Sequence, residues 1–156
     1  WRLKGLKAEL GPSDLDYDHL TLDLSHAATA RQNSLDLVRA WGERLVHVHL
    51  TDGNGSAKDE HLLPGTGNQR ADEVLAELTR RHYGGHVVLE VNTNDLDRAG
   101  REQALASALA FARTTIGDAE VDAPQRHLCV HTLAEAVLPG EQVFIEDRSE
   151  TSSTAI

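Results

Sequence analysis

Short apolar runs and amphipathic stretches alternate along the middle of the chain. Runs rich in aliphatic and β-branched residues predict three strands, at 20–25, 45–50 and 86–91. Stretches with apolar residues at helical spacing predict three helices, at 33–42, 69–82 and 98–115. This β-α-β-α-β-α order predicts an α/β fold, with parallel strands and with helices packed outside them.

The pattern lapses on both sides of this unit. After Gly117 the sequence predicts a short helix at 131–137 and a short strand at 142–146, neither of which continues the repeat. Residues 149–154 are polar, and we expect them to be disordered. The expected organisation is an irregular N-terminal segment, an α/β unit and an irregular C-terminal extension: 1–19, 20–116 and 117–156.

The composition fits one ordinary globular domain. The 156 residues are 40% hydrophobic and 26% charged, and no apolar run is long enough to cross a bilayer, so we expect no membrane partner. A net charge of −10 argues against broad electrostatic capture of nucleic acid. Cys129 is the single cysteine, which excludes an internal disulfide and favours a cytoplasmic location. Because the chain begins at Trp1 and contains no methionine, we expect a piece of a longer protein.

Imidazole and carboxylate side chains recur where the predicted strands end. The strand ends and the loop after the second strand supply six of them: Asp23, His26, His49, Asp59, His61 and Glu90. Because the carboxyl ends of parallel strands lie on a common face, these side chains can converge. Their nitrogen and oxygen atoms are ligands that Zn²⁺ and Mn²⁺ accept.

Each candidate also has a structural explanation. Asp23 could cap the following turn, and any single histidine could be half-buried and bonded to the backbone. Glu90 is harder to explain in this way, because a carboxylate inside an apolar run costs several kcal/mol unless it is paired or binds a metal. We expect His47 to point away from His49, and Asp52 to support a ligand histidine. The remaining histidines are expected to be structural or on the surface: His82, His86, His127 and His131.

Several short segments together resemble one superfamily. Leu22-Asp23-Leu24-Ser25-His26 resembles the Asp-x-x-His motif of the xylose-isomerase-like barrels, which include sugar phosphate isomerases/epimerases and endonuclease-IV-like AP endonucleases. His47-Val48-His49-Leu50-Thr51-Asp52 resembles their seventh strand, with His49 in the metal-ligand position. Asp59-Glu60-His61 and Pro64-Gly65-Thr66-Gly67 are similar to the Asp-x-His and Gly-x-Gly loop of the endonuclease branch. Gly84-Gly85-His86-Val87-Val88-Leu89-Glu90 resembles the eighth strand and its terminal metal-binding glutamate.

The resemblance spans about 20–115 and implies the last three βα units of a (β/α)₈ TIM barrel, which is an incomplete barrel. It also implies a divalent metal, Zn²⁺ or Mn²⁺, with Mg²⁺ or Co²⁺ as alternatives. Family members carry two further histidines and a bridging glutamate on earlier strands, and this chain has no counterpart for them.

The resemblance favours a metal-dependent sugar phosphate isomerase or epimerase, which transfers a proton on a ketose or hydroxy-ketone through an enediolate. Asp23 and His49 would be metal ligands. Glu90 would be both a ligand and the catalytic acid/base, and His26 would lie near the substrate oxygens or hold a second metal. The partner would be a small sugar or sugar phosphate. We expect the chain by itself to be inactive and to self-associate through open sheet edges.

The alternative from the same superfamily is an endonuclease-IV-like zinc phosphodiesterase that acts on abasic DNA. One zinc would be held by Asp23, His49 and Glu90, and another by His26, Asp59 and His61. The acidic charge and the scarcity of interleaved arginine and aromatic residues disfavour this nucleic-acid partner. A non-catalytic remnant is the third hypothesis.

Overall fold

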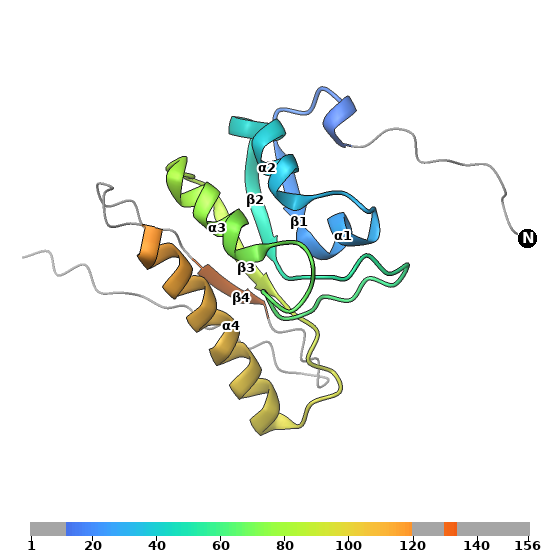
Figure 1. Ribbon diagram of the computed structural model, residues 1–156, viewed down its shortest axis with the longest axis vertical. Helices are drawn as coiled ribbons and strands as arrows, with labels where there is room; N and C mark the ends of the chain where they lie inside the picture. The colour runs from blue at the N-terminus through green and yellow to red at the C-terminus, as the bar shows by residue number, and fades with distance from the viewer. Residues whose placement is uncertain (1–11, 120–129, 134–156) are drawn as a thin grey trace, which may run out of the picture.

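The computed structural model describes residues 12–119 and 130–133, and its strands form one parallel sheet in the order β1-β2-β3-β4 (Figure 1). The strands are β1 (Leu20–Asp23), β2 (Leu45–Leu50), β3 (His86–Glu90) and β4 (Val130–Leu133). The helices are α1 (Leu24–Thr29), α2 (Ser34–Trp41), α3 (Ala71–Arg80) and α4 (Arg98–Ala119), with short 3₁₀ turns at Pro12–Asp14 and Gly42–Arg44. The predicted α/β fold with parallel strands is confirmed.

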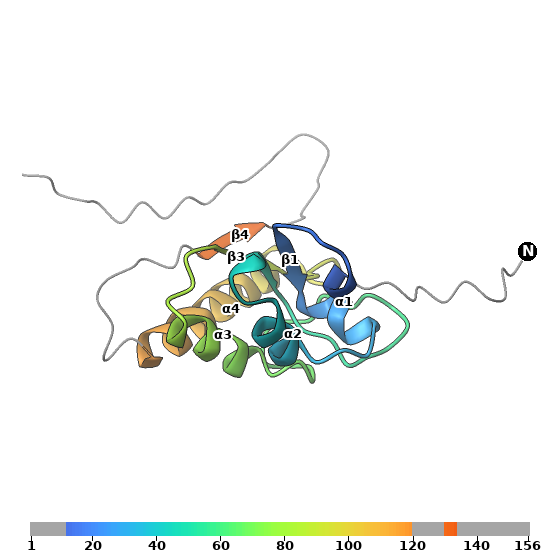
Figure 2. The same ribbon diagram turned by 90° about the horizontal axis from the view of Figure 1, so that it is seen from above.

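The helices α2, α3 and α4 lie on one face of the sheet, as Figure 2 shows from above. Each of them follows a strand and precedes the next, and the strands follow one another in sequence order. This arrangement is that of consecutive βα units of a (β/α)₈ barrel. In the described part of the chain the sheet stays open, with β1 and β4 at its edges. The fold is therefore part of a TIM barrel.

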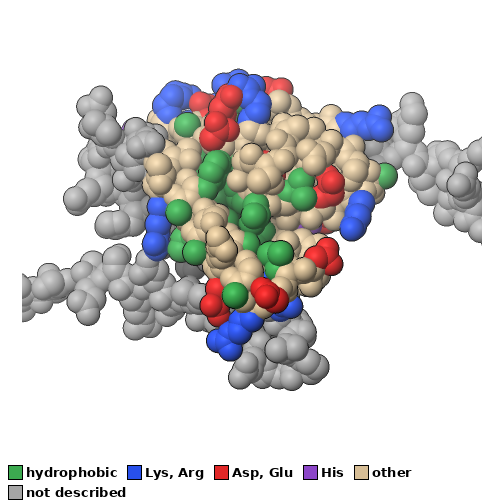
Figure 3. Space-filling view, turned by 60° about the horizontal axis from the view of Figure 1, so that its bottom comes forward, with side chains coloured by type: hydrophobic (Ala, Val, Ile, Leu, Met, Phe, Trp, Pro, Cys, Tyr) green, Lys and Arg blue, Asp and Glu red, His purple; other side chains and the backbone are tan. Residues whose placement is uncertain are grey.

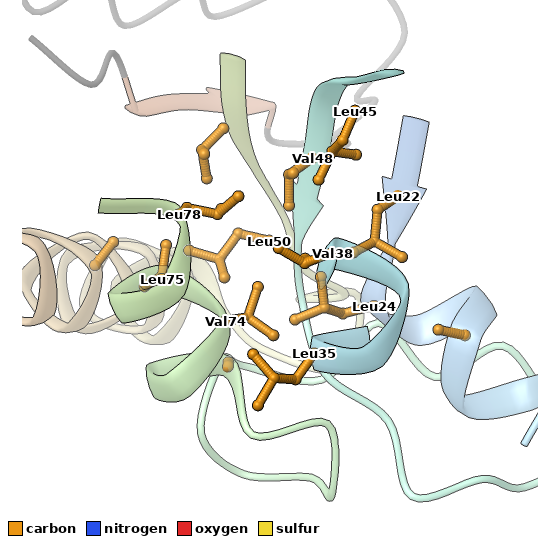
Figure 4. Close-up of a cluster of buried hydrophobic side chains, with 14 of the residues drawn as sticks. Leu22, Leu24, Leu35, Val38, Leu45, Val48, Leu50, Val74, Leu75 and Leu78 are labelled. Atoms are coloured by element: carbon orange, nitrogen blue, oxygen red, sulfur yellow. The ribbon is translucent and has the colours of Figure 1, made fainter. Parts of the chain in front are cut away.

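The hydrophobic core fills the space between the sheet and the helices (Figure 4). Val48 and Leu50 of β2 are fully buried there, and so are Val74 and Leu75 of α3. Burying such a side chain stabilises the fold by about 1.5–3 kcal/mol. Alternation along β2 sends His49 away from this core, toward the sheet face that these helices do not cover. The core thus fixes which strand residues are available for chemistry.

Two local predictions are wrong. The first strand was expected to continue to residue 25, but it ends at Asp23, whose carboxylate caps α1 by accepting a hydrogen bond from the His26 backbone N–H. Residues 131–133, expected in a helix, belong to β4, which pairs in parallel with β3 and so extends the repeat. Pairing with an open strand edge has overridden a weak local pattern. The strand expected at 142–146 and the tail at 149–154 lie outside the described residues.

The surface mixes charged and apolar groups. On the face drawn in Figure 3, acidic and basic side chains are interspersed around the margin, and hydrophobic side chains form a band in the middle. Tyr17 and Leu96 are the large hydrophobic side chains that are exposed among the described residues. Within the same part of the chain, no helix combines the length and the apolar character needed to cross a membrane.

Candidate metal centre

The carboxylate of Asp23 has two roles, one for each oxygen. Its Oδ1 accepts the hydrogen bond from the His26 backbone N–H, 2.9 Å away, that starts α1. Its Oδ2 lies 3.1 Å from Nδ1 of His49 on the neighbouring strand, where Asp23 and His49 are direct partners in the register. Both interpretations of Asp23 therefore apply: it caps the helix, and it faces a candidate ligand. The residue is buried, with 8% of its surface exposed.

The imidazole of His49 faces two carboxylates with one nitrogen. Besides Asp23, the Oε2 atom of Glu90 lies 2.6 Å from Nδ1 of His49. Within the described residues this oxygen is buried and accepts no hydrogen bond. A proton on Nδ1 can point well at only one of these two oxygens, and a lone pair there would be repelled by both. Three donor atoms therefore face a common space that suits a cation.

A second group forms beside the first, around the exposed carboxylate of Asp59. Its Oδ2 lies 2.9 Å from Nε2 of His26 and 2.9 Å from Nε2 of His61. Its Oδ1 accepts a 2.6 Å hydrogen bond from the Ser25 hydroxyl. Ser25 Oγ in turn accepts from the backbone N–H groups of Glu60 and His61. The loop is thereby held against α1.

The ring of His61 is oriented by the end of β3. Its Nδ1 lies 3.2 Å from the carbonyl oxygen of Glu90, and a carbonyl can only accept, so Nδ1 carries a proton. In the neutral ring Nε2 then bears a lone pair directed at the Asp59 carboxylate. Only a second proton or a cation makes that contact favourable. His61 also adopts a left-handed backbone with φ of 46°.

The titration behaviour of this pair reflects its contacts. Burial opposes the charged form of His61, but the Glu90 carbonyl and the carboxylates of Asp23 and Asp59 outweigh it and raise the pKa of His61. Burial alone would raise the pKa of Asp59, but the Ser25 hydroxyl and the imidazoles of His61 and His26 lower it. Both groups therefore favour their charged forms in the folded chain.

The buried carboxylate of Asp52 accepts hydrogen bonds from the backbone on both sides of the segment that carries Asp59 and His61. Asp52 Oδ1 accepts from the backbone N–H groups of Gly53 and Gln69, and Oδ2 accepts from that of Gly65. These contacts correct the expectation that Asp52 supports a ligand histidine, because its partners are backbone amides. A Cβ on Gly67 would collide with the Asp52 carboxylate, which explains the glycine in Pro64-Gly65-Thr66-Gly67.

The expectation for His47 is also wrong. The rings of His47 and His49 are 5.1 Å apart between centroids, and they lie on the same side of β2. Side chains two residues apart share a face of a strand, so the error was one of periodicity. His82 and His86 are exposed, as expected. His127 lies outside the described residues, and His131 lies in β4.

The structure brings all six predicted site residues together at the carboxyl end of the sheet. Two sets offer ligand atoms within 4.8 Å of one another: Asp23, His49 and Glu90, and Asp23, His26 and His61. Asp59 contacts both histidines of the second set. The roles of these residues as ligands or catalytic groups stay predictions. Sequence reasoning quoted Ser25 within a motif but missed its part in holding Asp59, because that contact depends on how the later loop returns.

Comparisons with known proteins identify the family of the chain. Residues 16–115 match the model of a family described as xylose isomerase-like TIM barrel. An uncharacterised protein of Mycobacterium tuberculosis (strain ATCC 25618 / H37Rv) is 52% identical over 104 residues, which are 66% of this chain and 37% of that protein. The fructoselysine 3-epimerase of Escherichia coli O157:H7 is 35% identical over 52 residues, which are 33% of this chain and 18% of that enzyme.

Among solved structures, the chain is similar to the crystal structure of a D-tagatose 3-epimerase-like protein. The two are 31% identical, with a TM-score of 0.45, and the match covers 70% of this chain and 40% of the other. The chain therefore spans well under half the length of the relatives it matches, at 37% for the mycobacterial protein.

Proposed function

The chain belongs to the xylose isomerase-like TIM barrel family, and on that premise we propose that it carries the divalent-metal site of an isomerase or epimerase acting on a small sugar or sugar phosphate. The observation that carries the proposal is the convergence of Asp23, His49 and Glu90 from the ends of three successive strands. The similarity to a fructoselysine 3-epimerase supports the sugar substrate.

The donor set fits a divalent cation. Two carboxylates and one imidazole would hold it. The buried Oε2 of Glu90 accepts no hydrogen bond from the described residues, although Nδ1 of His49 lies 2.6 Å away, and a cation between these atoms would satisfy both. Such a mixed set suits Zn²⁺ or Mn²⁺, with Mg²⁺ or Co²⁺ as alternatives. When bound, the metal supplies positive charge that polarises substrate oxygens.

Two side chains at this site would have separate roles in the reaction, proton transfer and substrate binding. Glu90 would take a proton from the substrate carbon and return it, because its carboxylate borders the space where the donor atoms meet. His26 is exposed at the edge of the same space and would donate a hydrogen bond to a substrate oxygen. The family resemblance places the second carboxylate of a two-base transfer on an earlier strand, for which this chain has no counterpart. We therefore propose that the chain alone is inactive.

Metal binding to the purified chain is the first test. Calorimetric titration of the chelator-treated protein with Mn²⁺ or Zn²⁺ should give a saturable site, and Glu90→Gln should weaken it at least tenfold, because the amide loses the anionic ligand. Glu43→Gln, an exposed change at the other end of the sheet, should leave binding unchanged. Equal affinity in wild type and Glu90→Gln would favour the remnant hypothesis.

Activity provides the second test. In a complete barrel containing this segment, Glu90→Gln should abolish exchange of the substrate C–H proton with solvent deuterium while the fold is kept. Near-normal exchange would show that Glu90 is not the base. The isolated chain should show no turnover on ketose phosphates and should self-associate through the edges of β1 and β4. Turnover by a monomer would contradict this.

A specific contact favours a second function, a zinc phosphodiesterase of the AP endonuclease kind. One oxygen of Asp59 lies 2.9 Å from Nε2 of both His26 and His61, which is an arrangement that a second ion could occupy. Two zinc ions per chain, reduced to one by Asp59→Asn, together with cleavage of abasic-site DNA by a complete barrel, would establish this function over the isomerase. A single metal and no cleavage would exclude it.

A further inference from the structure

A cavity of about 760 Å³ opens at the amino end of the sheet. It lies between the beginnings of β2 and β3, where Leu45, Val46 and His86 line it, and the loop that follows α3. Because the strands are parallel, this end is opposite to the candidate metal centre. The volume is within the range of small-molecule sites, about 300–1,000 Å³.

The cavity has an apolar floor and a polar rim. Val38, Leu45 and Leu78, three residues of the hydrophobic core with 1–3% of their surface exposed, are among the residues that line it. Arg80 and Arg81 line it from the end of α3. A ligand that fits this lining has an apolar body and a charged or polar group at one end.

Arginines outnumber carboxylates around the rim. Arg80 and Arg81 both donate to Glu77, and Arg39 lies 4.0 Å from the same carboxylate. Among the residues that line the cavity, Arg80 and Arg81 stand beside one carboxylate, that of Glu43. Glu77 and Arg39 do not line it, so the rim is not acidic although the chain has a net charge of −10. Two nitrogens of Arg80 donate to Glu77, while Arg81 donates to Glu77 and to the Val38 carbonyl. A guanidinium has five N–H donors, so each retains donors for a ligand.

Tyr83 lines the cavity, and its hydroxyl makes a long hydrogen bond. Tyr83 donates to the His86 carbonyl over 3.4 Å, well beyond the usual distance of about 2.8 Å for O–H···O bonds. A Cβ on Gly85 would collide with this hydroxyl, so the glycine makes room for it. Burial raises the pKa of Tyr83, which keeps the hydroxyl protonated and able to donate at neutral pH.

We propose that this cavity binds a small organic anion, with its phosphate or carboxylate group on Arg80, Arg81 and the Tyr83 hydroxyl and its apolar body on the floor of Val38, Leu45 and Leu78. Guanidinium forks and a hydroxyl match such oxyanions. The site is independent of the metal centre and of the function proposed for it.

The probes are phenyl phosphate and benzoate, with benzyl alcohol as the neutral control and inorganic phosphate as the control without an apolar body. The chain is kept in chelator so that the metal centre cannot capture the anion. Titration followed by ¹H–¹⁵N NMR should give a Kd below about 1 mM for at least one aromatic anion. Shifts should centre on the amides of Gly84, Gly85 and His86. Both controls should bind at least fivefold more weakly.

Single substitutions test the contribution of each proposed contact to anion binding. Tyr83→Phe should weaken binding about fivefold, the effect of one neutral hydrogen bond, and Arg80→Gln about tenfold, that of a charge-assisted one. Arg98→Gln, an exposed arginine on α4, and Glu90→Gln at the metal centre should leave binding unchanged. Equal binding of benzyl alcohol, shifts centred on the metal centre, full affinity in Tyr83→Phe and Arg80→Gln, or no binding of either anion would each overturn the proposal.

Discussion

Two carboxylates, one near each end of the sheet, differ in the positive charge that surrounds them. Glu77 on α3 is nearly buried, with 9% of its side chain exposed, and it accepts hydrogen bonds from Arg80 and Arg81. Glu90 at the end of β3 faces His49, and within the described residues its ion pairs are with histidines alone. One acid has its countercharge built into the same helix, and the other does not.

The difference indicates where a cation from outside would bind. Around Glu77, arginines three and four residues away on one helix supply the positive charge locally. Around Glu90, the sheet brings in Asp23 as a second carboxylate, and the His49 imidazole between them carries at most one positive charge. His61, the other histidine near Glu90, is shared with the carboxylate of Asp59. Keeping such a cluster partly buried is costly unless another cation joins it. Charge balance, rather than burial alone, separates Glu77 from Glu90.

Asp52 is a third kind of acid and should show the largest effect, because it is fully buried and its carboxylate accepts from three backbone N–H groups rather than from arginines. Asp52→Ala should lower the free energy of unfolding by at least about 3 kcal/mol, since several buried donors lose their acceptor. Asp52→Asn should cost less, because one oxygen stays. Urea unfolding in chelator measures both. A loss below about 1 kcal/mol in Asp52→Ala would show that the loop amides find other partners.

The second prediction is that metal binding distinguishes the carboxylates of Asp23 and Glu90 from that of Glu77. At a hundredfold excess over its Kd, Mn²⁺ or Zn²⁺ should raise the free energy of unfolding by about 2.7 kcal/mol. Asp23→Asn and Glu90→Gln should lose this gain, whereas Glu77→Gln should keep it, although all three remove a carboxylate. Thermal unfolding with and without metal makes the measurement. An equal gain in all three variants would mean that the ion binds elsewhere.

Local sequence signals were sufficient for most of the elements. Strands β2 and β3 and helices α2 and α4 begin within one residue of the prediction. The apolar runs mark the two strands, and the Asn33 cap marks the start of α2. The choice of Asp23, His49 and Glu90 as a group followed from strand-end placement together with the family resemblance. Their position at one end of the sheet needed only parallel topology.

Contacts between distant segments were not predictable in this way. Asp52 was assigned to a histidine because nothing local shows that Gly65 and Gln69 return to it. Strand β4 depends on an open edge of β3 rather than on its own four residues. Helix α1 arises where Asp23 redirects the chain, so a pattern read as continuing strand missed it. The Asp52 and β4 errors lie where a partner far along the chain decides the structure, whereas the errors at α1 and His47 are local ones of capping and of strand periodicity.

The smallest expected effect concerns Glu77 and its dependence on pH. The Arg80 hydrogen bond, helped by Arg81 and opposed by burial, lowers the pKa of Glu77 from 4.5 to about 2. A pKa lowered in the folded state stabilises the fold above the unfolded value, and the gain is lost as pH falls from about 4.5 through about 2. Glu77→Gln should therefore cost about 1 kcal/mol at pH 7, and this difference from wild type should shrink steadily below pH 4.5.

The matched control for this last measurement is Glu102→Gln, which removes an exposed partner of Arg98 on α4. Its cost should be below about 0.5 kcal/mol, because water screens that pair. Urea unfolding of both variants at pH 7, 5 and 3 gives the comparison. A Glu77→Gln difference that is unchanged between pH 7 and pH 3 would show that packing, rather than charge, stabilises this part of α3. The contrast with Glu90 would then fail, because arginines would not be balancing the charge of Glu77.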